Sequence, residues 1–515
     1  MQTKVLRLGM GPRLWRAGAL SRAWRDALAR EPRSVQFFEV VIFADGSFDP
    51  DGAALLERQT AWTRRVATPR WRAVCGSTAG GGDAKEGPNT HARALAAAVR
   101  GNPSAPGHVC VKDAGTGAAD VVELTAAIAT PPGCSVTSVD LSRLGLQAGD
   151  QGAVVALAPL VTRLDISWNA LTSSVIAAGI ADAPSSRLRE LDLGGLELPE
   201  GVHAARVALA SLTLRPTTGE GGLRKLNLSH HDIDDSGVGA LVGALRTGRC
   251  ALQHLNLADT AFTAAGLAEL CSALASEPNA LKVLDLSDAV WVDEQREQVQ
   301  VGVALRTALS SPHCHLTDLA VTGDELGDAG VKVVAAALGT CRLLQRLDLS
   351  DNQITAEGAA SLAAALGAQP AGAAAGAEAV SQLQELRLLG NAIGSGGATA
   401  FAQALRSGGC PLRLLELGNQ QEHTIGDEGA TALAGALAWS PCLTELGVDG
   451  NEISEPGATA LAQALSPMPG TEPADAPQRR CDLRTLSIAT NPIGSAGVEA
   501  VRPLRPLRDR FGDPA

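Results

Sequence analysis

One arrangement of apolar and polar residues recurs along most of the chain. An apolar residue is followed by further apolar residues at +3, +5 and +10, and often by Asn at +8. The segment LQRLDLSDNQI, residues 344–354, shows the arrangement most clearly. Fifteen candidate copies occur at spacings of 25 to 40 residues. They start at Phe38, Trp71, Pro106, Val136, Val161, Leu188, Leu223, Leu252, Leu281, Leu316, Leu344, Leu383, Leu412, Leu443 and Leu483.

Each copy has two halves with different periods. The first half alternates apolar and polar residues, as in LDL, and this period of two predicts a short strand. The second half, such as AEGAASLAAALGA at 356–368, is rich in Ala and Leu and predicts a helix opened by an acid–Gly turn. A strand and a helix repeated at a period of about 29 residues are typical of leucine-rich repeats. The sequence therefore predicts an α/β fold, a leucine-rich-repeat horseshoe solenoid with a parallel concave sheet and outer helices.

The Asn at +8 has a predicted structural role. Its side-chain amide is expected to bond backbone groups in the turn after the strand, which a curved parallel stack leaves unpaired. Copies with good motifs cover residues 136–502, and degenerate copies cover 36–135. An N-terminal segment, 1–35, precedes them, and a C-terminal tail, 503–515, follows.

The consensus of these copies, LxxLxLxxNxIxxxGaxaLaxaL, resembles the repeats of the ribonuclease-inhibitor-like leucine-rich-repeat family. That family also includes the Ran GTPase-activating proteins and the repeat domains of NOD-like receptors. The resemblance implies a concave sheet that binds protein partners, without naming a partner. The expected function is therefore non-catalytic protein binding, with Ran-type GTPase activation as a further alternative.

The segment 1–35 is separate from the repeats and rich in Arg. Residues 5–32 have an amphipathic helical rhythm, which fits a polar-faced cap on the first repeat or a mitochondrial-type presequence. The stretch RLWRAGALSRAWRDALAREP, 13–32, also resembles the latter half of an F-box, whose first half is missing here. That resemblance implies a substrate adaptor of an SCF-like ubiquitin ligase, with ligase core subunits bound through residues 5–32. The three interpretations stay open.

Composition narrows the function classes. The 515 residues carry a formal net charge of −12, only 3% aromatic residues and no Tyr. Tyr chemistry is excluded, and a basic groove with stacking aromatics for nucleic acid is not expected. No uncharged run is typical of a membrane span, and no P-loop, HExxH or GxSxG motif is present. We therefore expect no catalytic residue, cofactor, metal site, nucleic-acid partner or membrane partner.

Most of the ten cysteines follow the phase of the repeat. Cys134, Cys250, Cys314, Cys410 and Cys481 each stand two residues before a repeat start, while Cys341 and Cys442 lie within one residue of that phase. A residue tied to repeat phase is expected to pack at the corner between helix and strand and to stay reduced. The cysteines thus favour a cytoplasmic protein, with a mitochondrial or nuclear location as the alternatives.

Strand residues between the apolar positions are predicted to face the concave side. Many are acidic, which predicts a stripe that steers a protein partner with a basic surface. The alternative is that LDLS is simply the common strand sequence of this repeat. Trp168 is the strongest single hot-spot candidate in a chain so poor in aromatics. The predicted partner-binding residues are Asp140, Asp165, Trp168, Asp192, Asn227, His230, Asn256, Asp259, Asp285, Asp288, Asp348, Asp351 and Glu416.

Overall fold

The chain divides into two compact units of stacked strand–helix repeats. We call Met1–His231 with Arg249–Leu252 the N-terminal unit, and Asp232–Gly248 with Gln253–Ala515 the C-terminal unit. The computed structural model describes residues 39–41, 70–74, 96, 99–100, 108–112, 118–130, 136–182, 187–196, 222–247, 250–276, 279–291, 295–367, 381–407, 409–465 and 483–502. The segment 5–32 and the tail 503–515 lie outside these residues, and the predicted boundaries at 35, 135 and 502 stay predictions.

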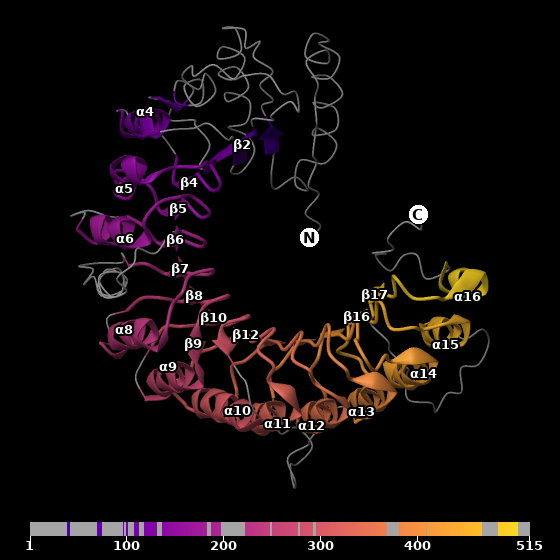
Figure 1. Ribbon diagram of the computed structural model, residues 1–515. Helices are drawn as coiled ribbons and strands as arrows, with labels where there is room; N and C mark the ends of the chain where they lie inside the picture. The colour runs from indigo at the N-terminus through magenta and orange to yellow at the C-terminus, as the bar shows by residue number, and fades with distance from the viewer. Residues whose placement is uncertain are drawn as a thin grey trace, which may run out of the picture. The chain divides into compact units, whose positions relative to one another are not determined.

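The described strands of the N-terminal unit pair in parallel in the order of the chain. They are β1 (Glu39–Val41), β2 (Arg70–Val74), β3 (His108–Lys112), β4 (Ser138–Asp140), β5 (Arg163–Asp165), β6 (Glu190–Asp192) and β7 (Lys225–Asn227). The helical segments are α4 (Ala118–Ala129), the 3₁₀ turn η1 (Ala148–Asp150), α5 (Gln151–Val155) and α6 (Ser173–Asp182). These helices lie on one side of the strands that they connect (Figure 1).

The C-terminal unit repeats the same plan with longer helices. Its described strands also pair in parallel in chain order. They are β8 (His254–Asn256), β10 (Val283–Asp285), β12 (Asp318–Ala320), β13 (Arg346–Asp348), β14 (Glu385–Arg387), β15 (Leu414–Glu416), β16 (Glu445–Gly447) and β17 (Thr485–Ser487). Two further strands, β9 (Phe262–Thr263) and β11 (Val290–Trp291), form a separate parallel pair that the repeat pattern did not predict.

The helices of the C-terminal unit form a layer along one side of its strands (Figure 1). They are α8 (Asp235–Arg246), α9 (Ala264–Ser276), α10 (Gln295–Leu309), α11 (Gly327–Leu338), α12 (Ala356–Gly367), α13 (Gly394–Arg406), α14 (Gly426–Leu437), α15 (Glu455–Leu465) and α16 (Gly494–Val501). Each of the fifteen predicted repeat starts lies within two residues of the first residue of a described strand. The prediction of an α/β leucine-rich-repeat solenoid is confirmed.

The apolar positions of each repeat form the core between strand and helix. In the repeat that begins at Leu344, the side chains of Leu344, Leu347, Leu349 and Ile354 are at most 1% exposed. Each such burial contributes about 1.5–3 kcal/mol. The glycine near the helix start is needed for close packing, because a Cβ on Gly358 would lie 2.8 Å from the Ile354 side chain. Small residues at the start of the helix therefore let it pack closely against the large residues that precede it.

Candidate functional site

The Asn at +8 forms a buried ladder that holds successive repeats together. In the C-terminal unit, Asn391 Oδ1 accepts hydrogen bonds from the backbone nitrogens of Asn352 and Ile354, both at 3.0 Å, and its Nδ2 donates to the Leu349 carbonyl at 3.0 Å. This confirms the predicted role of the amide. We call this row the Asn ladder; its members with this bonding are Asn169, Asn352, Asn391, Gln420, Asn451 and Asn491.

The last residues of the strands form a second row, which we call the central row. Its predicted site residues are Asp140, Asp165, Asp192, Asn227, Asn256, Asp285, Asp348 and Glu416, all half-buried. Most of them close the turn that follows the strand. Asp348 Oδ1, for example, accepts from the backbone nitrogen of Ser350 at 3.1 Å and from its hydroxyl at 2.6 Å. Such a bond gives Asp a structural reason to occupy the position in LDLS, whatever binds there.

Within the N-terminal unit, the central row concentrates negative charge. Burial, followed by the neighbouring carboxylates of Asp192 and Asp140, raises the pKa of Asp165, although hydrogen bonds from Ser167 oppose the shift. In the C-terminal unit the row is interrupted by Ala320, Arg387, Gly447 and Ser487. The central row is therefore not a continuous acidic stripe.

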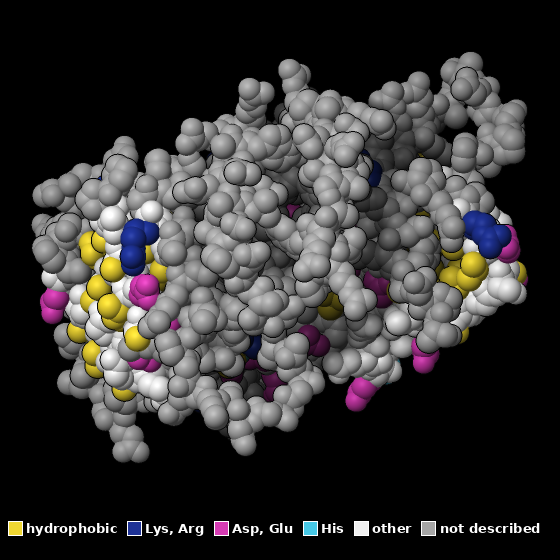
Figure 2. Space-filling view, turned by 90° about the horizontal axis from the view of Figure 1, so that it is seen from above, with side chains coloured by type: hydrophobic (Ala, Val, Ile, Leu, Met, Phe, Trp, Pro, Cys, Tyr) yellow, Lys and Arg dark blue, Asp and Glu magenta, His cyan; other side chains and the backbone are white. Residues whose placement is uncertain are grey.

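A third row, formed by the first residues of the strands, carries both signs of charge. Arg163 and Lys225 approach Glu190 at 3.8 and 3.1 Å in the N-terminal unit. In the C-terminal unit Arg346 pairs with Asp318. Exposed pairs of this kind contribute about 0–1 kcal/mol each. Seen from above, the described surface likewise shows Asp and Glu dispersed among apolar and polar side chains (Figure 2).

A fourth row lies one residue before the Asn ladder and has a left-handed backbone, with φ between 50° and 73°. We call it the left-handed row. Its members are Arg143, Trp168, Gly195 and His230 in the N-terminal unit, and Asp259, Asp288, Gly323, Asp351, Gly390, Asn419, Gly450 and Thr490 in the C-terminal unit. Within each unit, backbone hydrogen bonds join successive repeats here, such as Arg143 N to Ser167 O at 3.0 Å and Trp168 N to Gly194 O at 2.9 Å.

In the C-terminal unit, the left-handed row is acidic. The side chains of Asp288 and Asp351 lean toward the next repeat, where a Cβ on Gly323 or Gly390 would collide with their carboxylates. Both aspartates are exposed and make no hydrogen bond or ion pair within the described part of the chain. Desolvation, and then the carboxylates of Asp259, Asp351 and Asp285, raise the pKa of Asp288. Asp288 and Asp351 therefore carry negative charge that no bond within the described part of the chain explains.

In the N-terminal unit, the left-handed row is aromatic and cationic. The Trp168 ring lies across the backbone of Gly195, where a Cβ would come within 2.9 Å of the ring. Its centroid is 4.7 Å from that of the His230 ring, two repeats further along the chain. The Arg143 guanidinium carbon lies 5.1 Å from the centroid of Trp168. The indole remains 45% exposed, so it is fixed in place without being covered.

Three helix starts of the C-terminal unit, those of α9, α12 and α15, bind a carboxylate from the preceding helix. Asp328 Oδ1 accepts from the backbone nitrogens of Thr355 and Gly358, both at 2.9 Å, at the start of α12. Asp427 bonds Ser454 and Gly457 in the same way at the start of α15. An anionic group at a helix N-terminus is favourable because it meets unpaired N–H groups and the positive end of the helix dipole.

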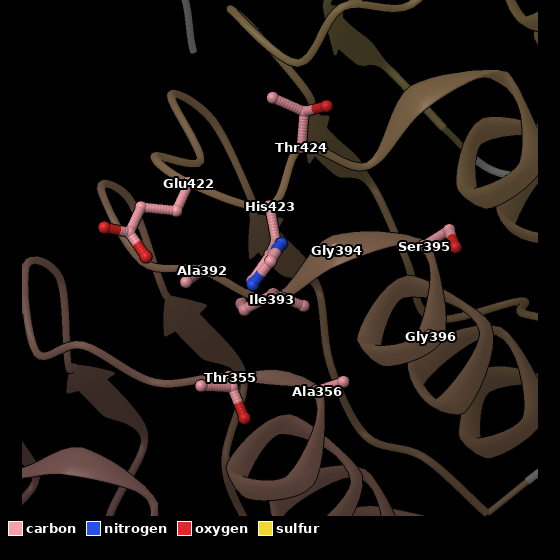
Figure 3. Close-up of a pocket in the computed structure, with 10 residues that line it drawn as sticks. All are labelled: Thr355, Ala356, Ala392, Ile393, Gly394, Ser395, Gly396, Glu422, His423 and Thr424. Carbon is pink, nitrogen blue, oxygen red and sulfur yellow. The ribbon is translucent and has the colours of Figure 1, made fainter.

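The equivalent position before α13 is Ala356, and a cavity of about 650 Å³ opens there. It is lined by Thr355 and Ala356, by residues 392–396, and by residues 422–424 of the long strand–helix loop. His423 points into the cavity toward Ile393 and Gly394, whereas Glu422 turns away (Figure 3). The His423 carbonyl accepts a hydrogen bond from the Gly394 nitrogen at 2.9 Å. The cavity thus lies beside an Ala at the position that Asp328 and Asp427 hold in their repeats, and beside the long loop.

The described cysteines are free thiols. Cys110, Cys271, Cys314, Cys341 and Cys410 are buried, and burial raises the pKa of Cys314 and of Cys410 to about 11 each. Cys442 is exposed, so packing at the corner does not account for this residue. Cys134 and Cys481 lie outside the described residues. Thiols with raised pKa values form little thiolate near neutral pH and are poor nucleophiles.

The predicted site residues lie in two different rows of the structure, the central row and the left-handed row. The predicted Trp168 and His230 meet, and Asp259, Asp288 and Asp351 share the left-handed row, whereas the remaining residues occupy the central row. Sequence reasoning did not single out Arg143. Its signal was positional: it stands seven residues after the repeat start at Val136, as Trp168 does after Val161.

The described residues also bear on metal sites and membrane spans. They contain no group of three or more His, Cys, Asp or Glu placed to hold a metal ion. Within the same residues, no helix has the length and hydropathy to cross a membrane.

Known proteins match the repeats in part. Residues 223–242, 340–363 and 440–462 match the family model described as Leucine Rich repeat. The ribonuclease inhibitor of Sus scrofa is 29% identical over 222 residues, which are 39% of this chain and 44% of that protein. The Tonsoku-like protein of Mus musculus is 32% identical over 196 residues, which are 37% of this chain and 12% of that protein. The match thus spans less than half the length of either relative.

Among solved structures, the complex of Rad7 and Elc1 in yeast is similar to 93% of this chain and 92% of that chain. The TM-score is 0.43 and the sequence identity is 10%. A similarity this low does not support a shared function.

Proposed function

We propose that this chain, a ribonuclease-inhibitor-like leucine-rich-repeat protein, is a non-catalytic protein that binds a partner on its strand face. Leucine-rich-repeat proteins generally mediate protein–protein interaction. One relative is by its name an inhibitor of a ribonuclease, and the target of this chain is proposed only as a protein with a basic surface. The cytoplasm is the proposed location, because its reducing conditions keep thiols such as those described free.

The observation that carries the proposal is the acidic part of the left-handed row. Asp259, Asp288 and Asp351 are exposed on one surface of the C-terminal unit, and their mutual repulsion contributes to the raised pKa of Asp288. A partner with Lys or Arg side chains at matching positions would relieve that repulsion and be attracted from a distance. The central-row aspartates support the proposal less, because their hydrogen bonds to the following turn already account for them.

The test removes charge without disturbing the backbone. Asn tolerates left-handed conformations as Asp does, so Asp259→Asn, Asp288→Asn and Asp351→Asn combined should leave the fold intact. A partner is first recovered from cell extract on the immobilised full chain, and its affinity is then measured by titration calorimetry. We expect the triple variant to bind roughly tenfold more weakly, at about 0.5 kcal/mol for each lost contact.

A matched control makes the same change in net charge on the helices. Glu269→Gln, Glu357→Gln and Glu499→Gln alter exposed acids of α9, α12 and α16. This variant should keep the affinity within about twofold, because distant exposed charges are screened by salt. Equal losses in both triple variants, or none in either, would contradict recognition by the left-handed row.

A substrate adaptor of a ubiquitin ligase is the alternative proposal. It is supported by the F-box resemblance of residues 13–32 within the segment 5–32. Ligase core subunits should then be recovered by the full chain and lost when residues 1–35 are removed. A Ran-type GTPase recovered by both forms would favour GTPase activation instead.

A further inference from the structure

We propose that Arg143, Trp168 and His230 form a preorganised receptor for a carboxylate side chain of a protein partner. We call these three residues the Arg–Trp–His platform. The proposal rests on the proposed function as a protein-binding chain and adds a second recognition chemistry in the N-terminal unit. The acidic part of the left-handed row would take basic side chains, whereas the platform would take an acidic one.

The platform is held in place by backbone and packing together. The backbone hydrogen bonds that join Arg143, Trp168 and Gly195 to the following repeats place them in consecutive repeats. Neighbouring strands of a parallel sheet lie about 4.8 Å apart. Trp168 and His230 belong to repeats that are two apart, so their backbones are separated by roughly twice that spacing. Their rings nevertheless meet at 4.7 Å, because the indole reaches across Gly195, which has no side chain.

Arg143 is exposed and has no acidic partner among the described residues. It forms no ion pair and no side-chain hydrogen bond within the described residues. The central-row acids of the repeats that carry Arg143 and Trp168 are already engaged: Asp140 accepts from the Ser142 hydroxyl at 2.7 Å and from Cys110 Sγ at 3.1 Å, and Asp165 accepts from Ser167. A guanidinium stacked on an indole keeps its N–H donors around its rim.

An incoming carboxylate is the group that fits those donors. A carboxylate can accept two parallel hydrogen bonds from one guanidinium, and such bonds are stronger than neutral ones. Stacking on Trp168 fixes the long Arg143 side chain before binding, so less conformational freedom is lost when the partner arrives. The exposed part of the indole then offers an apolar surface to the residue next to the acid, and Trp and Arg are the residue types enriched in binding hot spots.

The test uses short synthetic peptides with a central Glu between two Leu residues, and matched peptides with Gln or Lys in place of Glu. Full-length chain should retain Glu peptides roughly tenfold better than Gln peptides. Arg143→Met, which keeps an unbranched side chain over the ring but removes the charge, should abolish that preference. Circular dichroism and the melting temperature of the variant should match those of the original chain, since residue 143 is exposed.

Gly195→Ala tests the positioning of the ring. The added methyl group displaces the indole from the backbone, so the preference for Glu should fall by several-fold while Arg143 is unchanged. In protein labelled with 5-fluorotryptophan, the Trp168 signal is assigned by its loss in Trp168→Phe. That signal should shift on addition of Glu peptides and not of Gln peptides, and it should already be displaced in Gly195→Ala.

The Lys peptides separate this proposal from the proposed function. The Asp259, Asp288 and Asp351 triple variant should lose binding of Lys peptides and keep the preference for Glu over Gln. An unchanged preference in Arg143→Met, or no preference in the original chain, would overturn the platform while leaving the acidic row standing.

Discussion

In the repeats that carry an Asn-ladder residue, this residue directly follows the left-handed row, yet the two positions obey different constraints. At residue 391 the side chain is 1% exposed and supplies three hydrogen bonds to backbone groups that would otherwise be unpaired. At residue 390 the only requirement is a left-handed backbone, with φ at 66°. In the repeats of the ladder the first position is therefore held by Asn or Gln, which make these bonds, whereas the second admits several residue types.

This difference shows where the molecule can vary without losing its fold. The left-handed row holds a cation and aromatic rings in the N-terminal unit, and carboxylates separated by glycines in the C-terminal unit. The backbone conformation is the same in both. Side-chain chemistry in this row is thus free to serve binding, while the chemistry of the ladder is committed to the fold.

The largest expected effect comes from breaking the ladder. Asn391→Ala leaves three buried backbone groups without partners and should lower the free energy of unfolding by about 2–4 kcal/mol. Asp351→Asn, in the left-handed row of the preceding repeat, should change it by less than about 0.5 kcal/mol. Urea unfolding followed by circular dichroism measures both, and comparable losses would remove the distinction between the rows.

A smaller effect is expected from the backbone requirement alone. Gly390→Ala forces a Cβ into the left-handed region and pushes the Asp351 carboxylate aside, which can swing away. The expected loss is about 1–2 kcal/mol. Gly435→Ala is the matched control, because it lies inside α14 with nothing within 4 Å of the new methyl group. That variant should instead gain about 0.5–1 kcal/mol from helix propensity, and a loss there would point to a general intolerance of Ala.

The bonding of the ladder was predictable from sequence, and so were several residues of the row beside it, but the contacts within that row were not. Asn recurs at +8 in phase with buried leucines, so its bonding role followed from the need to satisfy a curved parallel stack. Gln420 replaces Asn and keeps the same bonds, although it falls outside the simple motif. The contacts among Arg143, Trp168 and His230 depend on the lean of one ring across a glycine, which no periodicity encodes.

The same limit applies to the acids. The pattern predicted aspartates on the concave face of the strands. The sequence could not show which of these carboxylates accept hydrogen bonds from Ser hydroxyls and which accept none within the described residues. Side-chain bonds such as Ser350 to Asp348 decide that question. The same holds for the helix caps. Asp328 and Asp427 each bond the start of the helix in the next repeat, whereas a cavity lies beside Ala356, and the sequence did not indicate either arrangement.

The smallest expected effect is the dependence of stability on pH in the left-handed row. Desolvation and the nearby acids raise the pKa of Asp288 in the folded chain, so the folded state binds more protons than the unfolded state between the two pKa values. The charged carboxylate then costs stability above its folded pKa, and that cost is relieved as the pH falls. Asp288→Asn should gain about 0.3 kcal/mol at pH 7 after screening by solvent, and the gain should vanish below about pH 4.

Asp427, which is also in the C-terminal unit, has a pKa shifted in the opposite direction to that of Asp288. Burial opposes its ionisation, but the hydrogen bonds from Ser454 and Gly457 outweigh burial and lower the pKa of Asp427. Its contribution is present above the unfolded pKa and is lost as the pH falls through the folded one. Asp427→Asn should therefore be less stable than the original chain at pH 7 and approach it in acid, which urea unfolding between about pH 3 and 7 can follow. If the free energy of unfolding varied with pH in the same way for Asp288→Asn and Asp427→Asn, Asp288 would stabilise the fold as the capping Asp427 does. Asp288 would then not be available to bind a partner.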